Sequence, residues 1–218
     1  MLRGTISPIP KTKNISANVS EYRPVMQSSY LLKIFEVHVL EFLSEKIGLN
    51  CRQFGFRKGS SITDACLILK DLMKKYSTCK KSAYAIFIDL TKAFDNVDHS
   101  ILGKKLLKSN IPIDLVLIIL RYLRNQQANI RWKGSLSIYY IIEKGVRQGG
   151  ILSPFLFNFY INSIIEEISD MDVGCNYGFT RCNIIAYADD LVLLAPSIMD
   201  TECFYLKLQY VKLYIYLN

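Results

Sequence analysis

The sequence has few of the residues that build disulfide frameworks or zinc sites. Its six cysteines stand at positions 51, 66, 79, 175, 182 and 203, none of them in a Cys-x-x-Cys pair, and the chain has only two histidines. Disulfide scaffolds are typical of much shorter secreted chains, and zinc sites usually need closely spaced Cys or His ligands. We therefore expect reduced thiols, in the core or at the surface, and an intracellular protein.

Long hydrophobic runs are also missing. The most apolar segment, IPIDLVLIILRYLR at 111–124, is interrupted by Asp114 and Arg121 and is shorter than the ~20 residues that a membrane-spanning helix needs. Residues 1–16 contain no apolar core of the signal-peptide type. These absences predict a soluble protein without a signal peptide or membrane segment, although 50% of the residues are hydrophobic.

Acidic residues are the minority among the charged ones. The 218 residues include 27 Lys and Arg but only 19 Asp and Glu, which gives a net charge of +8 at pH 7. A basic excess attracts polyanions, nucleic acid above all, although many basic proteins bind none. The basic residues are dispersed in small groups, so we interpret most individual lysines as parts of solvated helix faces.

Helical and strand patterns are mixed along the chain. Helices are predicted at 28–48, from Ser61 to 76, from Asp98 to 109, at 114–126, from Ser153 to 168 and at 199–216. Ser61 and Asp64 form a capping-box pattern. A buried strand is predicted at 84–90, and hairpins at 128–142 and around 187–190, whereas residues 1–28 are predicted as loop and short strand. Segregated helices and antiparallel hairpins predict an α+β fold.

Two adjacent carboxylates, Asp189 and Asp190, interrupt the apolar stretch NIIAYADDLVLLAP. Like charges are costly near a core unless a cation or water compensates them. Because both flanks are predicted strands, the pair is expected at the tip of a hairpin. Asp89 ends the strand at 84–90, where acidic residues are uncommon. If the strands share one sheet, three carboxylates converge at one edge.

Such a trio has two interpretations. Carboxylate oxygens suit Mg²⁺, and two ions ~3.5–4 Å apart can support phosphoryl or nucleotidyl transfer. However, Asp pairs are common at turns, and an Asp at a strand end can cap the following turn. The YADD tetrapeptide alone leaves both interpretations open.

The order of several segments resembles the reverse transcriptases of non-LTR (LINE-type) retrotransposons, particularly the jockey-like elements of animals. SPIPKTKN and YRPV look like fingers segments, and QFGFRKGSSITDA resembles the family stretch Q-x-GF-x-x-x-x-ST-x-DA. FIDLTKAFDNVDHSIL, GVRQGGILSPFLFNFYIN and AYADDLVLLA look like polymerase motifs A, B and C, respectively. The resemblance covers nearly the whole chain, and the motifs follow the order found in the family.

The resemblance implies a right-hand polymerase core with fingers and palm, in which an antiparallel palm sheet packs on helices. Residues 1–83 would belong to the fingers and residues 84–218 to the palm. Fingers elements would be interleaved near 100–145, and no separate second domain is expected. Motif D, the thumb and the upstream endonuclease of full-length elements are not visible in the sequence, so we expect a truncated chain without a thumb.

Residue roles follow from the same resemblance. Asp89, Asp189 and Asp190 would be catalytic and would hold two Mg²⁺ ions, with Mn²⁺ as an alternative and with the backbone carbonyl of Leu90 as a further ligand. The residues expected to bind the nucleotide are Phe94 as an aromatic gate against the ribose 2′-OH, Gln148 and Gly149 in the motif B loop, and Lys11 and Arg23 at the triphosphate. Core packing would also explain Phe94.

The implied activity is RNA-directed DNA polymerisation. The implied partners are an RNA template, a DNA primer or target strand, and dNTPs, with no membrane and no obligate protein partner. A nuclear location is implied by the family only. One alternative is a non-catalytic remnant that binds RNA. Another, a palm-type nucleotidyl cyclase, does not account for RQGGILSP.

Overall fold

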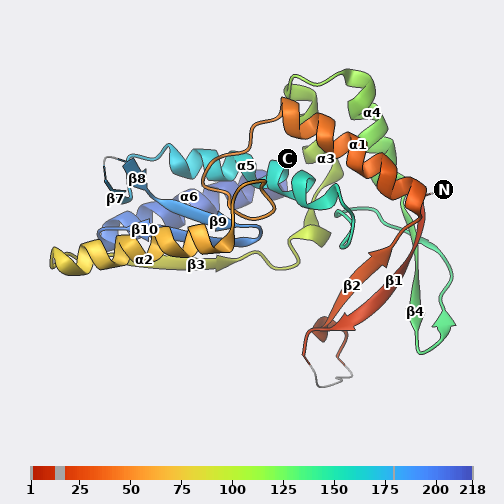
Figure 1. Ribbon diagram of the computed structural model, residues 1–218, viewed down its shortest axis with the longest axis horizontal. Coiled ribbons are helices and arrows are strands. Elements are labelled where there is room, and N and C mark those ends of the chain that lie inside the picture. Colours follow the sequence, from red (N-terminus) through yellow and green to blue (C-terminus); the bar gives the residue numbers. More distant parts are fainter. Residues whose placement is uncertain (1, 13–17, 179, 218) are drawn as a thin grey trace. The chain divides into compact units, whose positions relative to one another are not determined.

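The computed structural model describes residues 2–12, 18–178 and 180–217 (Figure 1). The chain divides into two compact units, one of Met1–Gly48 with Lys92–Phe157 and one of Leu49–Thr91 with Asn158–Asn218. The fingers–palm boundary between residues 83 and 84 stays a prediction, because these units follow spatial contacts and not motif assignments. Residues 13 and 14, at the end of the SPIPKTKN segment, lie outside the described residues.

The first unit contains a mixed five-stranded sheet. Its order is β2 (Tyr22–Gln27), β1 (Arg3–Pro10), β4 (Gln127–Trp132) and β5 (Ser135–Leu136), with β6 (Tyr140–Ile141) also pairing with β4. The pairing of β1 with β4 is parallel, and the other pairings are antiparallel. Lys133 and Gly134 connect β4 to β5 with φ angles of 47° and 86°. Positive φ at both positions is typical of the tight hairpin turn predicted there.

Strands β1 and β2 correct the prediction of loop and short strand for residues 1–28. Three prolines suggested irregular structure, because proline removes a donor from the ladder. Pro8, however, lies directly opposite Pro24, two positions from the pair Ile6–Met26. Because the N–H of Met26 points away from β1, to the carbonyl of Gln148, both pairs are of the non-hydrogen-bonded kind, and the missing proline N–H groups leave no β1–β2 acceptor without its donor. On its other side, β1 pairs with β4 only over Arg3–Ile6, before either of its own prolines.

Helices of the first unit begin close to the predicted positions. They are α1 (Tyr30–Lys46), α3 (His99–Lys108) and α4 (Ile113–Arg124), and the short 3-10 helices are η1 (Val19–Glu21) and η2 (Phe94–Asn96). The Oδ1 of Asp98 caps α3, because it accepts from the backbone N–H groups of Ser100 and Ile101 at 2.7 and 3.0 Å. The buried side chains include Leu43, Leu102, Leu106, Val116 and Ile119.

The second unit is built on a three-stranded antiparallel sheet. Its order is β3 (Tyr84–Asp89), β10 (Asp190–Ala195) and β9 (Ile184–Tyr187). α2 (Ile62–Thr78) contacts β9, and α6 (Ile198–Leu217) contacts β3 and β10. α5 (Ser153–Ser169) begins in the first unit and continues in the second. The predicted YADD hairpin and a strand at Tyr84–Asp89 are therefore confirmed. The prediction that this strand is buried is wrong: β3 is an edge strand of the sheet, and its residues are exposed or half-buried, with Phe87 72% exposed.

Strands β9 and β10 of this sheet are covered on both faces, whereas β3 is largely exposed. Ile185 and Leu194 pack in one cluster with Leu72 of α2. The alternating residues Ile184 and Leu193, which point to the opposite face, are fully buried as well. Burial on both faces explains why β9 and β10 are continuous apolar runs and do not alternate with polar residues.

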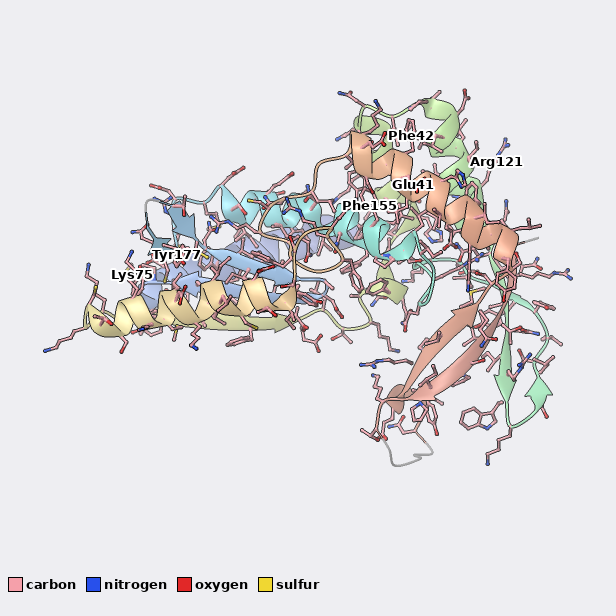
Figure 2. The ribbon with its side chains drawn as sticks, in the orientation of Figure 1. Glu41, Phe42, Lys75, Arg121, Phe155 and Tyr177 are labelled. Atoms are coloured by element: carbon pink, nitrogen blue, oxygen red, sulfur yellow. The ribbon has the colours of Figure 1, made fainter. Side chains whose placement is uncertain are left out.

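Side chains of α2 hold a small hairpin that was not predicted. The hairpin consists of β7 (Cys175–Tyr177) and β8 (Thr180–Cys182). Lys75 Nζ donates to the carbonyl of Asn176 at 3.1 Å, and Tyr177 Oη donates to Asp71 at 3.3 Å; Figure 2 labels Lys75 and Tyr177. At its start, α2 has the predicted capping box between Ser61 and Asp64.

Within the described residues, no helix is both long and apolar enough to cross a membrane. Their six cysteines are all free thiols; Cys175 and Cys182 are buried, and the other four are exposed.

Candidate active site

The YADD sequence forms a tight hairpin tip in the second unit. Tyr187 pairs with Asp190, so Ala188 and Asp189 form the two-residue turn between β9 and β10. Ala188 has a φ of 55°, in the left-handed region that residues with a Cβ seldom adopt. Asp89 lies directly opposite Asp190 on the neighbouring strand. Directly opposed residues point to the same face, with Cβ atoms about 4.5–5.5 Å apart.

The three carboxylates influence one another electrostatically. Partial burial raises the pKa of Asp190, and the negative charges of Asp189 and Asp89 raise this pKa further. A donor set of three mutually repelling carboxylates suits a hard divalent cation. In the part of the chain that the structure describes, however, no three His, Cys, Asp or Glu side chains are arranged as a group that could hold a metal. The ligand roles of the three aspartates, and that of the half-buried Leu90 after β3, remain predictions.

A residue to which the sequence analysis gave no role contacts the tip directly. Gln53, with an exposed fraction of 1%, accepts from the Ala188 N–H through Oε1 at 2.9 Å and donates to the Ala188 carbonyl through Nε2 at 3.2 Å. Its only signal in the sequence was its position at the start of QFGFRKGSSITDA.

Phe94 is half-buried in the first unit. Its ring stacks on that of Phe157, with centroids 4.8 Å apart and an angle of 19° between the ring planes. The carbonyl of Phe94 accepts from the N–H of Val146 at 2.8 Å, which joins motif A to the motif B loop. This environment suits a packing role, and it also fixes the position of the ring for a gate.

The motif B loop lies against β2. The carbonyl of Gln148 accepts from the N–H of Met26 at 2.8 Å, and Gln148 Nε2 donates to Asp95 Oδ1 at 2.9 Å. Gly149 has a φ of 103°, and a Cβ there would lie 3.1 Å from the carbonyl oxygen of Met26. The positive φ favours glycine at this position, and a side chain there would be tightly spaced against Met26 as well. Asp95 thus acts as a hydrogen-bond acceptor for the motif B loop.

A buried ion pair supports the same loop. Glu36, fully buried in α1, accepts from Tyr122 Oη at 2.7 Å and from the N–H of Ile151 at 2.6 Å. Its Oε1 lies 3.9 Å from Arg147 Nη1. Burial, together with the negative charge of Glu36, raises the pKa of Tyr122 despite the nearby Arg147. Arg147 also donates through Nε to Gln126 at 2.9 Å.

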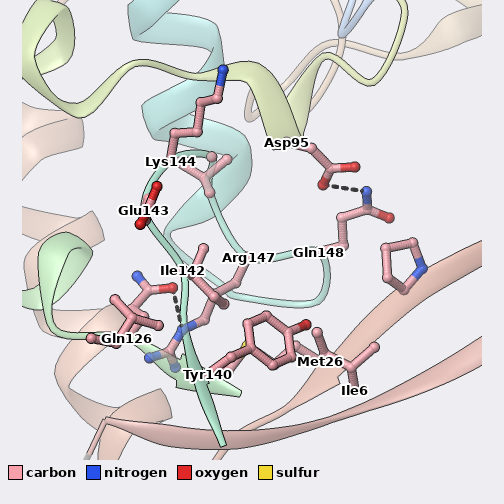
Figure 3. A pocket seen from close by; sticks show the side chains of 14 residues that line it. Ile6, Met26, Asp95, Gln126, Tyr140, Ile142, Glu143, Lys144, Arg147 and Gln148 are labelled. Carbon is pink, nitrogen blue, oxygen red and sulfur yellow. Dashed lines mark hydrogen bonds between the residues drawn. The ribbon is translucent and has the colours of Figure 1, made fainter. Parts of the chain in front are cut away.

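A cavity of about 400 Å³ adjoins the motif B loop. Figure 3 shows the hydrogen bonds from Gln148 to Asp95 and from Arg147 to Gln126 beside it. Ile6, Met26 and other apolar side chains form much of its remaining wall.

Arg23 and Lys11 are exposed near the end of the β1–β2 hairpin. Arg23 lies opposite Ile9, and the N–H of Lys11 donates to the carbonyl of Glu21 at 2.8 Å. The two cations thus stand at neighbouring positions in the hairpin. They belong to the first unit, as do Phe94, Gln148 and Gly149, whereas the three aspartates belong to the second.

The family model for reverse transcriptase (RNA-dependent DNA polymerase) matches residues 9–211. The chain belongs to the reverse transcriptase family. This confirms the resemblance inferred from the motifs and their order.

Relatives of this reverse transcriptase chain are polyproteins and polymerases of non-LTR retrotransposons. The chain is 27% identical over 176 residues to the Pol polyprotein of the type-1 element R2 of Nasonia vitripennis, and it covers 17% of that protein. It is 28% identical over 203 residues to the RNA-directed DNA polymerase from mobile element jockey of Drosophila melanogaster, and it covers 20% of that protein. The alignments include 81% and 87% of this chain, respectively. The chain thus spans about a fifth of these relatives' length.

Among solved structures, the fold is similar to that of telomerase. Apo telomerase from Candida tropicalis matches with a TM-score of 0.62 over 97% of this chain and 42% of the telomerase chain, at 12% sequence identity. A form truncated from the C-terminal domain matches with a TM-score of 0.58 over 95% of this chain and 46% of its own. These matches support the α+β polymerase core expected from the sequence.

Proposed function

We propose that the chain is the fingers-and-palm core of an RNA-directed DNA polymerase from a non-LTR retrotransposon. It would transfer nucleotides from dNTPs to a primer 3′-OH on an RNA template. The observation that carries this proposal is the cross-strand pairing of Asp89 with Asp190 beside the Asp189 turn, in a chain whose family match spans residues 9–211.

Reverse transcriptases generally use divalent metal ions. Asp89 and Asp189 would hold two Mg²⁺ ions, or Mn²⁺ in their place, with Asp190 and the Leu90 carbonyl beside them. When bound, such ions activate the primer hydroxyl and neutralise charge on the leaving phosphates. The fit rests on the chemistry of the donor set: partial burial and the charges of Asp189 and Asp89 raise the pKa of Asp190, and a cation beside the three carboxylates would relieve this repulsion.

The nucleotide would be held by residues of the first unit. Arg23 and Lys11 are exposed cations suited to a triphosphate, and the planar guanidinium of Arg23 allows bidentate contacts. Gln148 and Gly149 would line the pocket, where the absence of a side chain on Gly149 lets the backbone approach the substrate. Phe94 would exclude the ribose 2′-OH.

The template and primer would be bound through their phosphates. The net charge of +8 favours such binding, which weakens as salt concentration rises. Stacking of exposed aromatic rings on unpaired bases would contribute as well.

Primer extension on an RNA template with Mg²⁺ tests the proposal. The wild-type chain should incorporate dNTPs, and Asp189→Ala should abolish incorporation while leaving the thermal unfolding midpoint nearly unchanged. Asp170→Ala, which removes an exposed aspartate just after α5, is the matched control and should stay active. Retained RNA binding without any incorporation by the wild type would instead support the non-catalytic RNA-binding remnant.

A further inference from the structure

The turn that carries Asp189 has an unfavourable backbone conformation. Ala188 has a φ of 55° and an exposed fraction of only 4%. A left-handed alanine persists only where surrounding contacts determine its conformation. The residues that contact Ala188 and hold it in this conformation are therefore the ones on which the geometry of the YADD tip depends.

Gln53 supplies the side-chain contacts to this alanine. Its amide makes a pair of hydrogen bonds with the main chain of Ala188, one accepted from the N–H and one donated to the carbonyl. These bonds fix both ends of the Gln53 amide relative to Ala188. Asp189 and Asp190 follow Ala188 directly in the chain.

Gln53 is itself held by its surroundings. The N–H of Gly55 donates to Gln53 Oε1 at 2.9 Å, and Asn158 of α5 donates to the carbonyl of Gly55 at 2.7 Å. Backbone hydrogen bonds from Phe54 to Ala186 and from Ala186 to Arg52 add the 52–54 segment to the free edge of β9. The amide of Gln53 is therefore presented from a fixed backbone.

The absence of a side chain at Gly55 allows the loop that carries Gln53 to lie close to the Ala188 turn. A Cβ at Gly55 would lie 2.3 Å from the nitrogen of Ala188 and 3.0 Å from the carbonyl carbon of Tyr187. Both are backbone atoms that cannot rotate away, so the close approach of the loop to the turn requires glycine.

We infer that Gln53 is a positioning residue, which holds the Ala188 turn in its left-handed conformation and thereby sets where Asp189 and Asp190 present their carboxylates. The catalytic consequence rests on the proposed polymerase function, whereas the conformational consequence does not.

The main test variant is Gln53→Met, which keeps the length of the side chain and removes both hydrogen bonds. Asn183→Leu is its matched control in the same unit, because Asn183 is fully buried and its amide donates to the carbonyls of Ile168 and Ser169 instead of to the tip. Both variants should lower the unfolding temperature. Only Gln53→Met should speed hydrogen exchange at the amides of 187–190, by about tenfold or more, and weaken binding of Mn²⁺ used as the metal probe.

In primer extension, Gln53→Met should lower kcat by about 10–100-fold, because small misplacements of reacting groups have effects of this size. KM for primer and template should stay within about twofold of the wild-type value. The substitution does not remove contacts that bind the substrates equally well in the ground state and the transition state. Adding Ala188→Gly to Gln53→Met should restore part of kcat and Mn²⁺ binding, since glycine adopts positive φ without strain.

The outcomes separate the two proposals. If the wild type incorporates no dNTP, the polymerase function fails, and the exchange and Mn²⁺ measurements still decide the role of Gln53. The positioning role is overturned if Gln53→Met has no larger effect than Asn183→Leu on hydrogen exchange at 187–190, on Mn²⁺ binding and on kcat. The same holds if Ala188→Gly restores nothing to a defective Gln53→Met variant.

Discussion

Asp89 and Asp190 occupy directly opposite positions on neighbouring antiparallel strands. Two residues of the same charge in this relationship destabilise a sheet, so the pair is unfavourable for folding alone. A role in binding a cation gives a physical reason for keeping both.

The first prediction concerns this repulsion. Asp190→Asn should raise the free energy of unfolding in EDTA by about 0.2–1 kcal/mol, near the lower end because solvent screens exposed charges. The corresponding rise in Tm is roughly 0.4–4 °C. Calorimetry with EDTA and with Mg²⁺ checks this: Mg²⁺ should raise the Tm of the wild type and have less effect on the variant. A variant that is less stable than the wild type in EDTA would contradict the repulsion argument.

A second prediction separates the two interpretations of Phe94. Phe94→Ala should increase the use of rNTPs relative to dNTPs by about tenfold or more. A single small substituent that clashes with a pocket wall, here the ribose 2′-OH, typically changes kcat/KM by about 10–200-fold. Phe94→Tyr, which keeps the ring, is the control and should retain the preference for dNTPs. The measurement is kcat/KM for each nucleotide. Unchanged sugar selectivity in the alanine variant, together with lower stability, would assign Phe94 to core packing against Phe157 alone.

The buried ion pair beneath the motif B loop leads to a third prediction. Arg147→Met should lower the free energy of unfolding by about 3–5 kcal/mol, because it leaves the buried charge of Glu36 uncompensated. The double variant Glu36→Leu with Arg147→Met removes both charges and should recover part of this loss. Urea denaturation of the four proteins of this cycle gives the coupling energy. If the double variant is no more stable than Arg147→Met, the loss in free energy of unfolding comes from altered packing and not from the uncompensated charge of Glu36.

A fourth prediction uses the two buried thiols. Burial raises the pKa of Cys175 and of Cys182 above the ordinary thiol value, with Arg52 opposing the rise at Cys182. Since the folded state holds these protons more tightly, their stabilising contribution is complete below about pH 8.5. It is lost as the pH rises through the raised pKa values. Urea midpoints between pH 7 and 11 should fall more steeply for the wild type than for Cys175→Ala with Cys182→Ala.

The same thiols should also react slowly. At pH 7.5, iodoacetamide should modify the exposed Cys51, Cys66, Cys79 and Cys203 well before the buried pair, because the thiolate is the reactive form. Mass spectrometry of the digested protein measures each rate. Equal rates at Cys182 and Cys66 would contradict the buried environment described here.

Local signals predicted most of the helices and their starts. Ser61 with Asp64, and Asp98 before α3, are capping residues whose hydrogen bonds form within a few positions of the chain. The YADD turn was predictable for the same reason, because apolar strands flank a short polar break. The prolines of β1 and β2 concealed a hairpin, since their tolerance there depends on which partner strand lies beside each one.

Long-range relationships could not be predicted in this way. No periodicity in the sequence pairs Asp89 with Asp190; the strand pattern allowed them to meet only if both strands share one sheet, and the resemblance to a polymerase family favoured that arrangement. Gln53 was missed because a polar residue in a loop has no distinctive local pattern, and its partner Ala188 is 135 positions away. Strands β7 and β8 have three residues each, too few for a pattern to be recognised.

The separation between Gln53 and Ala188 also has a consequence for biosynthesis. Closing so long a loop has a high entropic cost and favours slow acquisition of the contact. While the ribosome is still translating the residues between them, Gln53 has no Ala188 to which it can form hydrogen bonds. A nascent chain can therefore fold its early helices first, and it acquires the shape of its YADD turn only after synthesis has reached Ala188, 135 positions beyond Gln53.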